Sequence, residues 1–269
     1  MMRPYRKLSL SSSKRIVLAL SFLFIFTFTI TLAEAQTSNS TDLETLLETA
    51  NGLFNQKKYD ESIPYYDNIL MINASNIDAL NHKGLALWES HKYIESLPYF
   101  DQILAINPSN VKALNNKGLA LLGLQKNDEA IQYFDKVLSI NSSDVYALNN
   151  KGGALLIFQK NDEAIQYFDK VLSINSSDVY ALNNKAEALA EMGKNLEALS
   201  VIEKAAIDNP KDEALQSTMA FVLANMGKDD EARKYYEKAL KINPNLIEIL
   251  YEDEVEQFNR VMGNQTTSH

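Results

Sequence analysis

Cysteine is absent from the 269 residues, and histidine is scarce. Without thiolates the chain cannot form disulfides, nor the zinc, haem or iron–sulfur sites that depend on them. Two of the three histidines, His82 and His91, lie nine residues apart rather than the three or four of a helical metal pair. We therefore expect neither a metal site nor a cofactor.

Glycine and positive charge are also in short supply. The nine glycines form no phosphate-binding loop, nucleophile elbow or dinucleotide fingerprint. Lys and Arg total 26 against 35 Asp and Glu, which gives a net charge of -9 and argues against a nucleic-acid partner. Together these features predict a globular chain that is not an enzyme.

The longest apolar run, residues 16–33, follows five basic residues and precedes the A-x-A sequence 33–35. These are the parts of a secretory signal peptide, with cleavage expected before Gln36. An uncleaved membrane anchor is the alternative, because an 18-residue helix is about 27 Å long, close to the hydrocarbon thickness. Residues 1–35 are thus predicted to be a signal peptide or an N-terminal anchor.

The basic residues all precede the apolar run, so the N-terminus should stay in the cytoplasm under either interpretation. The rest of the chain is then extracytoplasmic, secreted or held at the membrane only through residues 16–33. It carries a net charge of -13, since the first 35 residues carry +4. Such an acidic chain should be repelled by anionic lipid headgroups.

A 34-residue period organises most of the remainder. The block 127–151 recurs unchanged at 161–185, and six windows fit without insertion or deletion: 43–76, 77–110, 111–144, 145–178, 179–212 and 213–246. Gene duplication explains the identical blocks more simply than a repetitive ligand does. Residues 36–42 are then a linker.

Each window has the same columns of small, apolar and Asn residues. The eighth place is Gly or Ala, the eleventh Leu, the twentieth Ser or Ala, the twenty-fourth bulky, and the thirty-first Asn. Small residues let two helices approach, acidic residues such as Asp128 begin the second helix, and Asn141 is expected to end it in the left-handed conformation. Each window therefore predicts two antiparallel helices whose core is too small to fold alone.

In these columns the chain resembles the tetratricopeptide repeat family across 43–246. The resemblance implies an all-α fold, an α-solenoid of six helix-turn-helix repeats. The chain departs from the family pattern in three ways. Lys stands in a place where the family often has Leu, and Gln216 stands where the family has a bulky residue. Pro64 and Pro98 lie inside second helices, where they should remove a backbone hydrogen bond or bend the helix.

The C-terminal segment 247–262 is predicted to be a capping helix. Its apolar residues Ile247, Leu250, Phe258 and Val261 should cover the open end of the stack, while acidic residues such as Glu254 stay largely solvated. The tail 263–269 is expected to be disordered.

The resemblance also implies that first helices line a concave groove that binds a peptide of a partner protein. Asn side chains both donate and accept hydrogen bonds, so a row of them can hold a peptide backbone, and tyrosines add flat apolar area. Glu187 and Glu191 extend the groove at its C-terminal side. The expected peptide-binding residues are Asn81, Lys112, Asn115, Asn116, Tyr146, Asn149, Asn150, Tyr180, Asn183, Asn184 and Glu187.

The amides have a second explanation, since they could bond between neighbouring repeats instead; the two uses do not exclude each other. The carboxylate clamp of chaperone-binding relatives is not expected, because only Asn51 and Lys112 of its five places match.

We predict an exported or membrane-anchored scaffold that binds a peptide of unknown identity. The alternative is a self-assembling structural envelope protein without a peptide ligand.

Five N-x-S/T sequons are present, only slightly more than composition predicts, and an exported protein could carry glycans on them in an organism that glycosylates. They begin at Asn39, Asn73, Asn141, Asn175 and Asn264.

Overall fold

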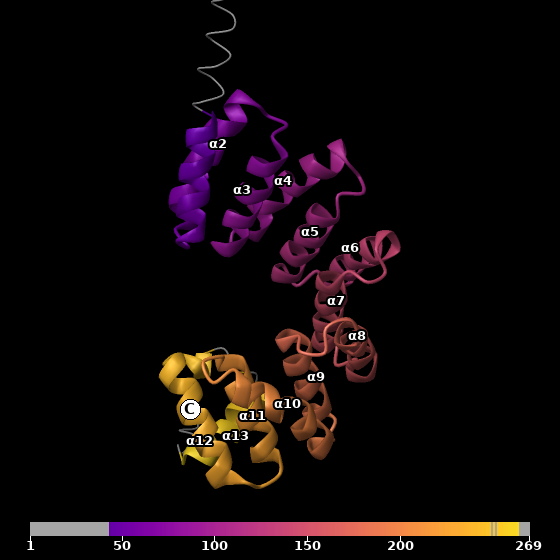
Figure 1. Cartoon of the computed structure of the whole chain (residues 1–269), viewed down its shortest axis with the longest axis vertical. Coiled ribbons are helices and arrows are strands. Elements are labelled where there is room, and N and C mark those ends of the chain that lie inside the picture. Colours follow the sequence, from indigo (N-terminus) through magenta and orange to yellow (C-terminus); the bar gives the residue numbers. More distant parts are fainter. Residues whose placement is uncertain (1–42, 249, 251, 264–269) are drawn as a thin grey trace, which may run out of the picture. The chain divides into compact units, whose positions relative to one another are not determined.

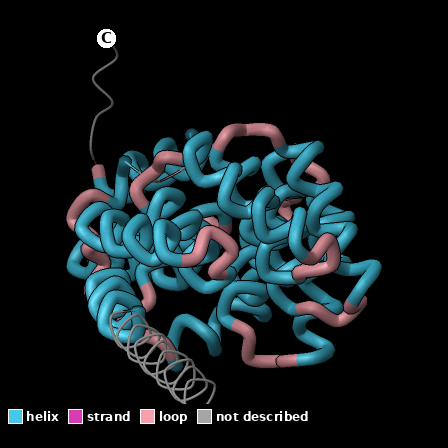
Figure 2. Tube along the Cα trace, turned by 90° about the horizontal axis from the view of Figure 1, so that it is seen from above, coloured by secondary structure: helices cyan, strands magenta, loops and turns pink. Residues whose placement is uncertain are grey.

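The computed structural model describes residues 43–248, 250 and 252–263. This part consists of helices and the short loops between them, without a strand (Figures 1 and 2). The predicted leader, linker and most of the tail, with the sequons at Asn39 and Asn264, lie outside it. None of the helices within the described ranges is long and apolar enough to cross a membrane.

Two sets of helices alternate along the chain, and each set repeats every 34 residues. The first helices are residues 43–55, α3 (Ile77–Glu89), α5 (Val111–Gly123), α7 (Val145–Ile157), α9 (Val179–Glu191) and α11 (Glu213–Asn225). The second helices are α2 (Tyr59–Ile72), α4 (Tyr93–Ile106), α6 (Asn127–Ile140), α8 (Asn161–Ile174), α10 (Asn195–Asp208) and α12 (Asp229–Ile242). The all-α fold predicted from the period is confirmed.

The chain divides into two compact units, residues 1–90 and 91–269, which we describe separately. In the described part of the first unit, α2 packs against α3, and Ala50, Tyr66, Ile69 and Ala79 form the core. In the second unit every helix from α4 to α12 packs against the next one, and α5, α7, α9 and α11 also contact one another in succession. We call the exposed side of α5, α7 and α9 the first-helix face.

Close helix approach depends on glycine where the partner ring is large. A Cβ atom on Gly118 would lie 2.4 Å from the ring of Phe134, and one on Gly152 would lie 2.5 Å from the ring of Phe168. This confirms the reason given for a small eighth residue, because the two helices could not pack this closely around a larger one.

The prediction for the end of the second helix was wrong. Asn141 is extended, with φ -137° and ψ 97°, and its side-chain oxygen accepts the N–H of Ser143 at 3.2 Å. Asn is therefore selected for a turn closed by its side chain rather than for a left-handed backbone. The same bond forms at Asn73, Asn107, Asn175 and Asn243.

The left-handed residue instead lies in the turn after the first helix. The φ angles there lie between 56° and 74°, at Lys57, His91, Gln125, Gln159, Gly193 and Gly227. Four of these residues carry a side chain that makes this conformation costly. Each described first helix from α3 to α11 begins after an Asn or Asp whose side chain accepts a backbone N–H, as Asp144 does from Ala147 at 2.9 Å.

Residues that depart from the family pattern are accommodated locally. The helices α2 and α4 continue through Pro64 and Pro98 over the same 14 residues as the other second helices. Gln216 is fully buried, and its Nε2 donates to the carbonyl oxygens of Ala206 and Asn209, at 2.8 and 3.3 Å. A polar anchor to the end of α10 thus replaces the bulky residue of the family pattern.

The capping helix is shorter than predicted. A 3₁₀ turn, η1 (Leu246–Glu248), precedes α13 (Glu252–Met262), which packs against α11 and α12. Phe258 and Val261 are buried as expected, but Ile247 is 43% exposed and Glu254 is buried. The helix begins too late for Ile247 to reach the core, and its register turns Glu254 inward.

Candidate functional site

The predicted amide row lies on the first helices, but its members differ in burial. Asn115 and Asn149 are only 7% and 9% exposed. Their Nδ2 atoms donate to Asp144 and Asp178, at 3.4 and 3.3 Å. Because these aspartates begin the next first helix, the two amides bond between neighbouring repeats, which is the alternative use that the sequence left open.

The neighbouring amides and tyrosines are more accessible. Asn116, Asn150, Asn183 and Asn184 are half-buried, as are Glu187 and, in the first unit, Asn81. Asn183 donates to Asn184 at 3.4 Å. Lys112 is exposed, and Tyr146 and Tyr180 are 77% and 69% exposed. The accessible part of the predicted site in the second unit is therefore a row of tyrosine and amide side chains on α5, α7 and α9.

Ion pairs join successive repeats behind this face, and the sequence analysis missed them. Lys151 pairs with Asp135 at 2.5 Å although the lysine side chain is only 14% exposed, and it lies 4.7 Å from the Tyr167 ring centroid. The same ion pair recurs as Lys83–Asp67, Lys117–Asp101 and Lys185–Asp169. The constant spacing of 16 residues between the Asp and Lys columns was the available signal.

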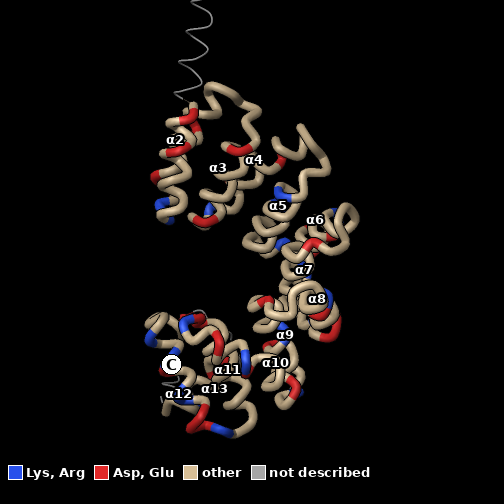
Figure 3. The backbone as a smooth tube through the Cα atoms, viewed as in Figure 1, with Lys and Arg blue, Asp and Glu red and all other residues tan. Residues whose placement is uncertain are grey.

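The environment of two of these lysines, Lys117 and Lys151, raises their pKa. Burial alone would lower the pKa of Lys151, but hydrogen bonds to Asp135 and Tyr167 and the charge of Asp135 outweigh it, so the pKa is raised above 10.5. The pKa of Lys117 is raised in the same way by Asp101 and Tyr133. Acidic and basic residues are interspersed along these helices (Figure 3).

The first unit has a different polar pair at the place that a carboxylate clamp would use. The hydroxyl of Tyr66 donates to Asn51 Oδ1 at 2.9 Å, and the Tyr66 ring stacks on His82 with centroids 5.9 Å apart. Burial raises the pKa of Tyr66 to about 12. Asn51 therefore serves this packing contact.

A pocket of about 340 Å³ lies in the second unit where α9 ends, and only one of its residues, Glu191, was noted from the sequence. The walls come from α9, the turn after it, α10, α11 and α13. Its lining residues are Ala190, Glu191, Gly193, Asn195, Phe221, Asn225 and Gln257. Because α13 supplies part of the wall, the pocket could not be found from the repeat columns alone. Within the described ranges, His, Asp and Glu side chains form no cluster that could hold a metal ion.

Comparisons with known proteins agree with this architecture. A tetratricopeptide repeat family model matches residues 81–145, and a model described as the Psidin N-terminal TPR repeats region matches residues 155–253. The two models together match more than half of the chain, so it belongs to the tetratricopeptide repeat family. No curated protein sequence matches it.

Solved structures share the fold at low sequence identity. A tetratricopeptide repeat protein from Parabacteroides merdae is 19% identical, with a TM-score of 0.62 over 85% of this chain and 95% of that one. PilF from Pseudomonas aeruginosa is 16% identical, with a TM-score of 0.65 over 82% and 98%. YrrB, described as a TPR protein with an unusual peptide-binding site, is 17% identical, with a TM-score of 0.51 over 72% and 97%.

Proposed function

We propose that this chain is a non-catalytic scaffold that binds a peptide segment of a partner protein on its first-helix face. The observation that carries the proposal is the exposure of Tyr146 and Tyr180, at 77% and 69%, on the successive helices α7 and α9. Tyrosines supply large, rigid contact area at low entropic cost and are enriched among residues that dominate binding energy.

Polar groups next to the tyrosines suit an extended backbone. Asn150 and Asn184 each follow a tyrosine by four residues, one helical turn, and both are half-buried, so their side chains are restrained but still reachable. Asn115 and Asn149 are proposed to act behind them, by fixing the spacing between repeats through their bonds to Asp144 and Asp178. Lys112 and Glu187 add one charge of each sign.

The likeness to YrrB supports this proposal at the level of the fold, because that protein is described as having a peptide-binding site. Protein interaction is also the general use of tetratricopeptide scaffolds. The partner is proposed to lie outside the cytoplasm, since residues 16–33 have the sequence of a signal peptide or an anchor. N-terminal sequencing and the intact mass of the protein from its host test export, cleavage and glycosylation of the sequons together.

The binding proposal is tested in two steps. In-cell cross-linking followed by mass spectrometry identifies partner segments, and calorimetry then measures their affinity for the full-length chain in mild detergent. We expect Tyr146→Ala and Tyr180→Ala each to weaken binding about tenfold, which corresponds to roughly 1.4 kcal/mol.

Leu196→Ala is the matched control, because Leu196 is 76% exposed but lies on the second helix α10. Unchanged affinity in both tyrosine variants, or equal losses in the control, would contradict the proposal.

Self-assembly is the second candidate function, because Ile106, Ile140 and Ile174 are about half exposed at the ends of successive second helices. Light scattering that finds only monomers at micromolar concentration excludes it.

A further inference from the structure

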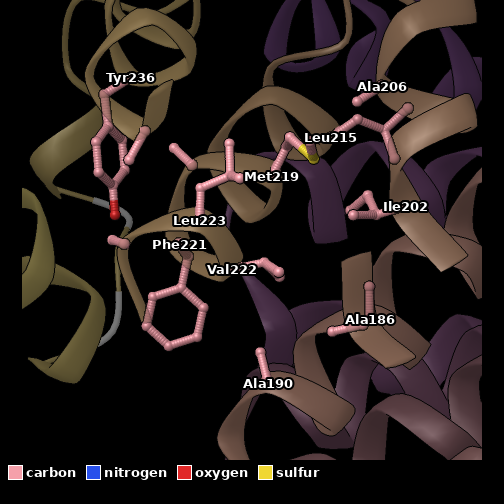
Figure 4. Packing of buried hydrophobic residues seen from close by; sticks show 14 of the residues in the cluster. Ala186, Ala190, Ile202, Ala206, Leu215, Met219, Phe221, Val222, Leu223 and Tyr236 are labelled. Atoms are coloured by element: carbon pink, nitrogen blue, oxygen red, sulfur yellow. The ribbon is translucent and has the colours of Figure 1, made fainter. Parts of the chain in front are cut away.

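The pocket at the end of α9 combines an apolar wall with three amide side chains and one carboxylate. Ala190 and Phe221, only 4% and 3% exposed, form the wall from facing helices (Figure 4). The polar lining consists of the Glu191 carboxylate and the amides of Asn195, Asn225 and Gln257. The amide oxygen of Asn195 is buried, as are those of Asn127 and Asn161 at the matched places of the two preceding repeats, so it belongs to the repeat plan and not to the pocket surface.

Glu191 is the single charged residue among those that line the pocket. Asn161 Nδ2 donates to Glu191 Oε2 at 2.8 Å, which holds the carboxylate in position. A carboxylate has about four acceptor sites, so it can accept further hydrogen bonds.

The nearby cations are paired with aspartates that do not line the pocket. Lys194 Nζ lies 3.7 Å from Asp162, and Nη1 of Arg260 donates to both carboxylate oxygens of Asp229, at 2.8 and 2.7 Å. Arg260 also donates to the carbonyl of Ala224 and to Oε1 of Gln257, which lines the pocket. The charge that the lining itself presents is therefore negative.

We propose that this pocket takes a single Lys or Arg side chain of the partner segment. The methylene groups of such a side chain suit the wall of Phe221 and Ala190, and its charged head suits the Glu191 carboxylate. A volume of 340 Å³ is near the lower end for ligand pockets, which favours one side chain over a larger ligand. The net charge of -9 complements a basic segment.

This inference rests on the proposed function, because Tyr180 and Glu191 share helix α9 and would contact the same segment. The probe is a library of N-acetylated, C-amidated nonapeptides, in which each pool fixes Lys, Arg, norleucine or Glu at one position. The full-length chain in mild detergent is incubated with each pool, and mass spectrometry measures retained peptide.

We expect one position at which Lys and Arg pools are retained about fivefold more than the norleucine pool, a ratio typical of a partly exposed ion pair. Glu191→Gln should abolish this ratio, and Glu191→Lys should shift the preference to the Glu pool. Glu203→Gln, which removes an equal charge from the exposed surface of α10, should keep the ratio. Thermal melts verify that the variants fold.

The outcomes distinguish failure of the pocket assignment from failure of the proposed peptide binding. Retention without a basic preference, or a basic preference that survives both Glu191 substitutions, overturns the pocket assignment and leaves peptide binding in place. Retention of no pool by the folded wild-type chain overturns both.

Discussion

The helices α7 and α11 occupy the same place in their repeats, yet one presents an open face and the other is enclosed. In α7 the buried residues are separated by exposed and half-buried ones, whereas ten consecutive residues of α11, 215–224, are buried. α11 packs more extensively on α9 than α7 does, and α13 covers it from the other direction. A common repeat plan therefore yields an open helix face in the middle and a closed core at the end.

Sequence differences at matched places explain part of this contrast. Met219 stands where the earlier repeats have Lys83, Lys117, Lys151 and Lys185, so a buried apolar side chain replaces an ion pair between repeats. Phe221 stands where α7 has Gly153, beside which there is open space. The difference teaches that closure of the stack requires both larger apolar residues and a covering helix.

The largest expected effect comes from weakening that cover. Phe258 is 1% exposed and its ring lies 4.9 Å from that of Tyr236. Phe258→Ala should lower the free energy of unfolding by about 3–5 kcal/mol, because a large buried ring is lost and a cavity remains. Urea denaturation followed by circular dichroism measures this. The control Ile247→Ala, at a 43% exposed position, should cost far less. Equal costs would mean that α13 does not close the core.

A smaller effect on stability is expected when the residue pair 152 and 168 is changed to the pair found one repeat later, at 186 and 202. Gly152→Ala places a Cβ 2.5 Å from the Phe168 ring and should destabilise by about 1–2 kcal/mol. Adding Phe168→Ile should recover stability, because Ala186 and Ile202 already hold these two places one repeat later and are both fully buried.

Gly153→Ala is the control for that variant. A Cβ there meets nothing within 4 Å, so only the gain in helix propensity should appear, up to about 1 kcal/mol. Chemical denaturation of the three variants checks the series, and a stabilising Gly152→Ala would refute the steric argument.

The turns after the first helices offer a comparable test. Gly227 has φ 72° and Gln159 has φ 56° at matched places. Gly227→Gln should cost about 1 kcal/mol and Gln159→Gly should gain a similar amount, because glycine adopts this conformation without strain. Differential scanning calorimetry compares the melting temperatures. Shifts of the same sign in both variants would be inconsistent with this account.

The smallest effect at neutral pH is expected from Lys151→Met, which copies the residue found at position 219. The stability change near pH 7 should be below about 1 kcal/mol, because Asp135 is half exposed and tolerates the loss of its partner. The raised pKa of Lys151 predicts that its contribution is complete below pH 10.5 and is lost as the pH rises through the folded-state value.

Unfolding measured from pH 8 to 11 tests that dependence. The wild-type chain should lose more stability above pH 10.5 than Lys151→Met does. Lys170→Met, which removes an exposed lysine over the same Tyr167 ring, should retain the wild-type loss. Identical profiles for all three proteins would show that the Lys151–Asp135 ion pair does not contribute to stability.

The periodic columns determined the paired helices, their 34-residue spacing and the need for a cap, because burial of one helix face leaves a repeating trace in the sequence. The same columns did not distinguish the buried Asn149 from the half-buried Asn150. Adjacent residues point to different sides of a helix, and only the packed neighbours decide which side is covered. They also assigned the left-handed conformation to Asn141 instead of to the turn at Gln125.

Sequence by itself thus determined which segments of residues 43–246 pair as helices and which small and apolar columns form their core, because these depend on local periodicity and side-chain size. Only the tertiary structure decided which amides are consumed between repeats, that Lys151 meets Asp135, and that α13 completes a pocket beside Glu191. These features join residues from different repeats or from outside the repeats, so their geometry exists only once neighbouring helices have packed.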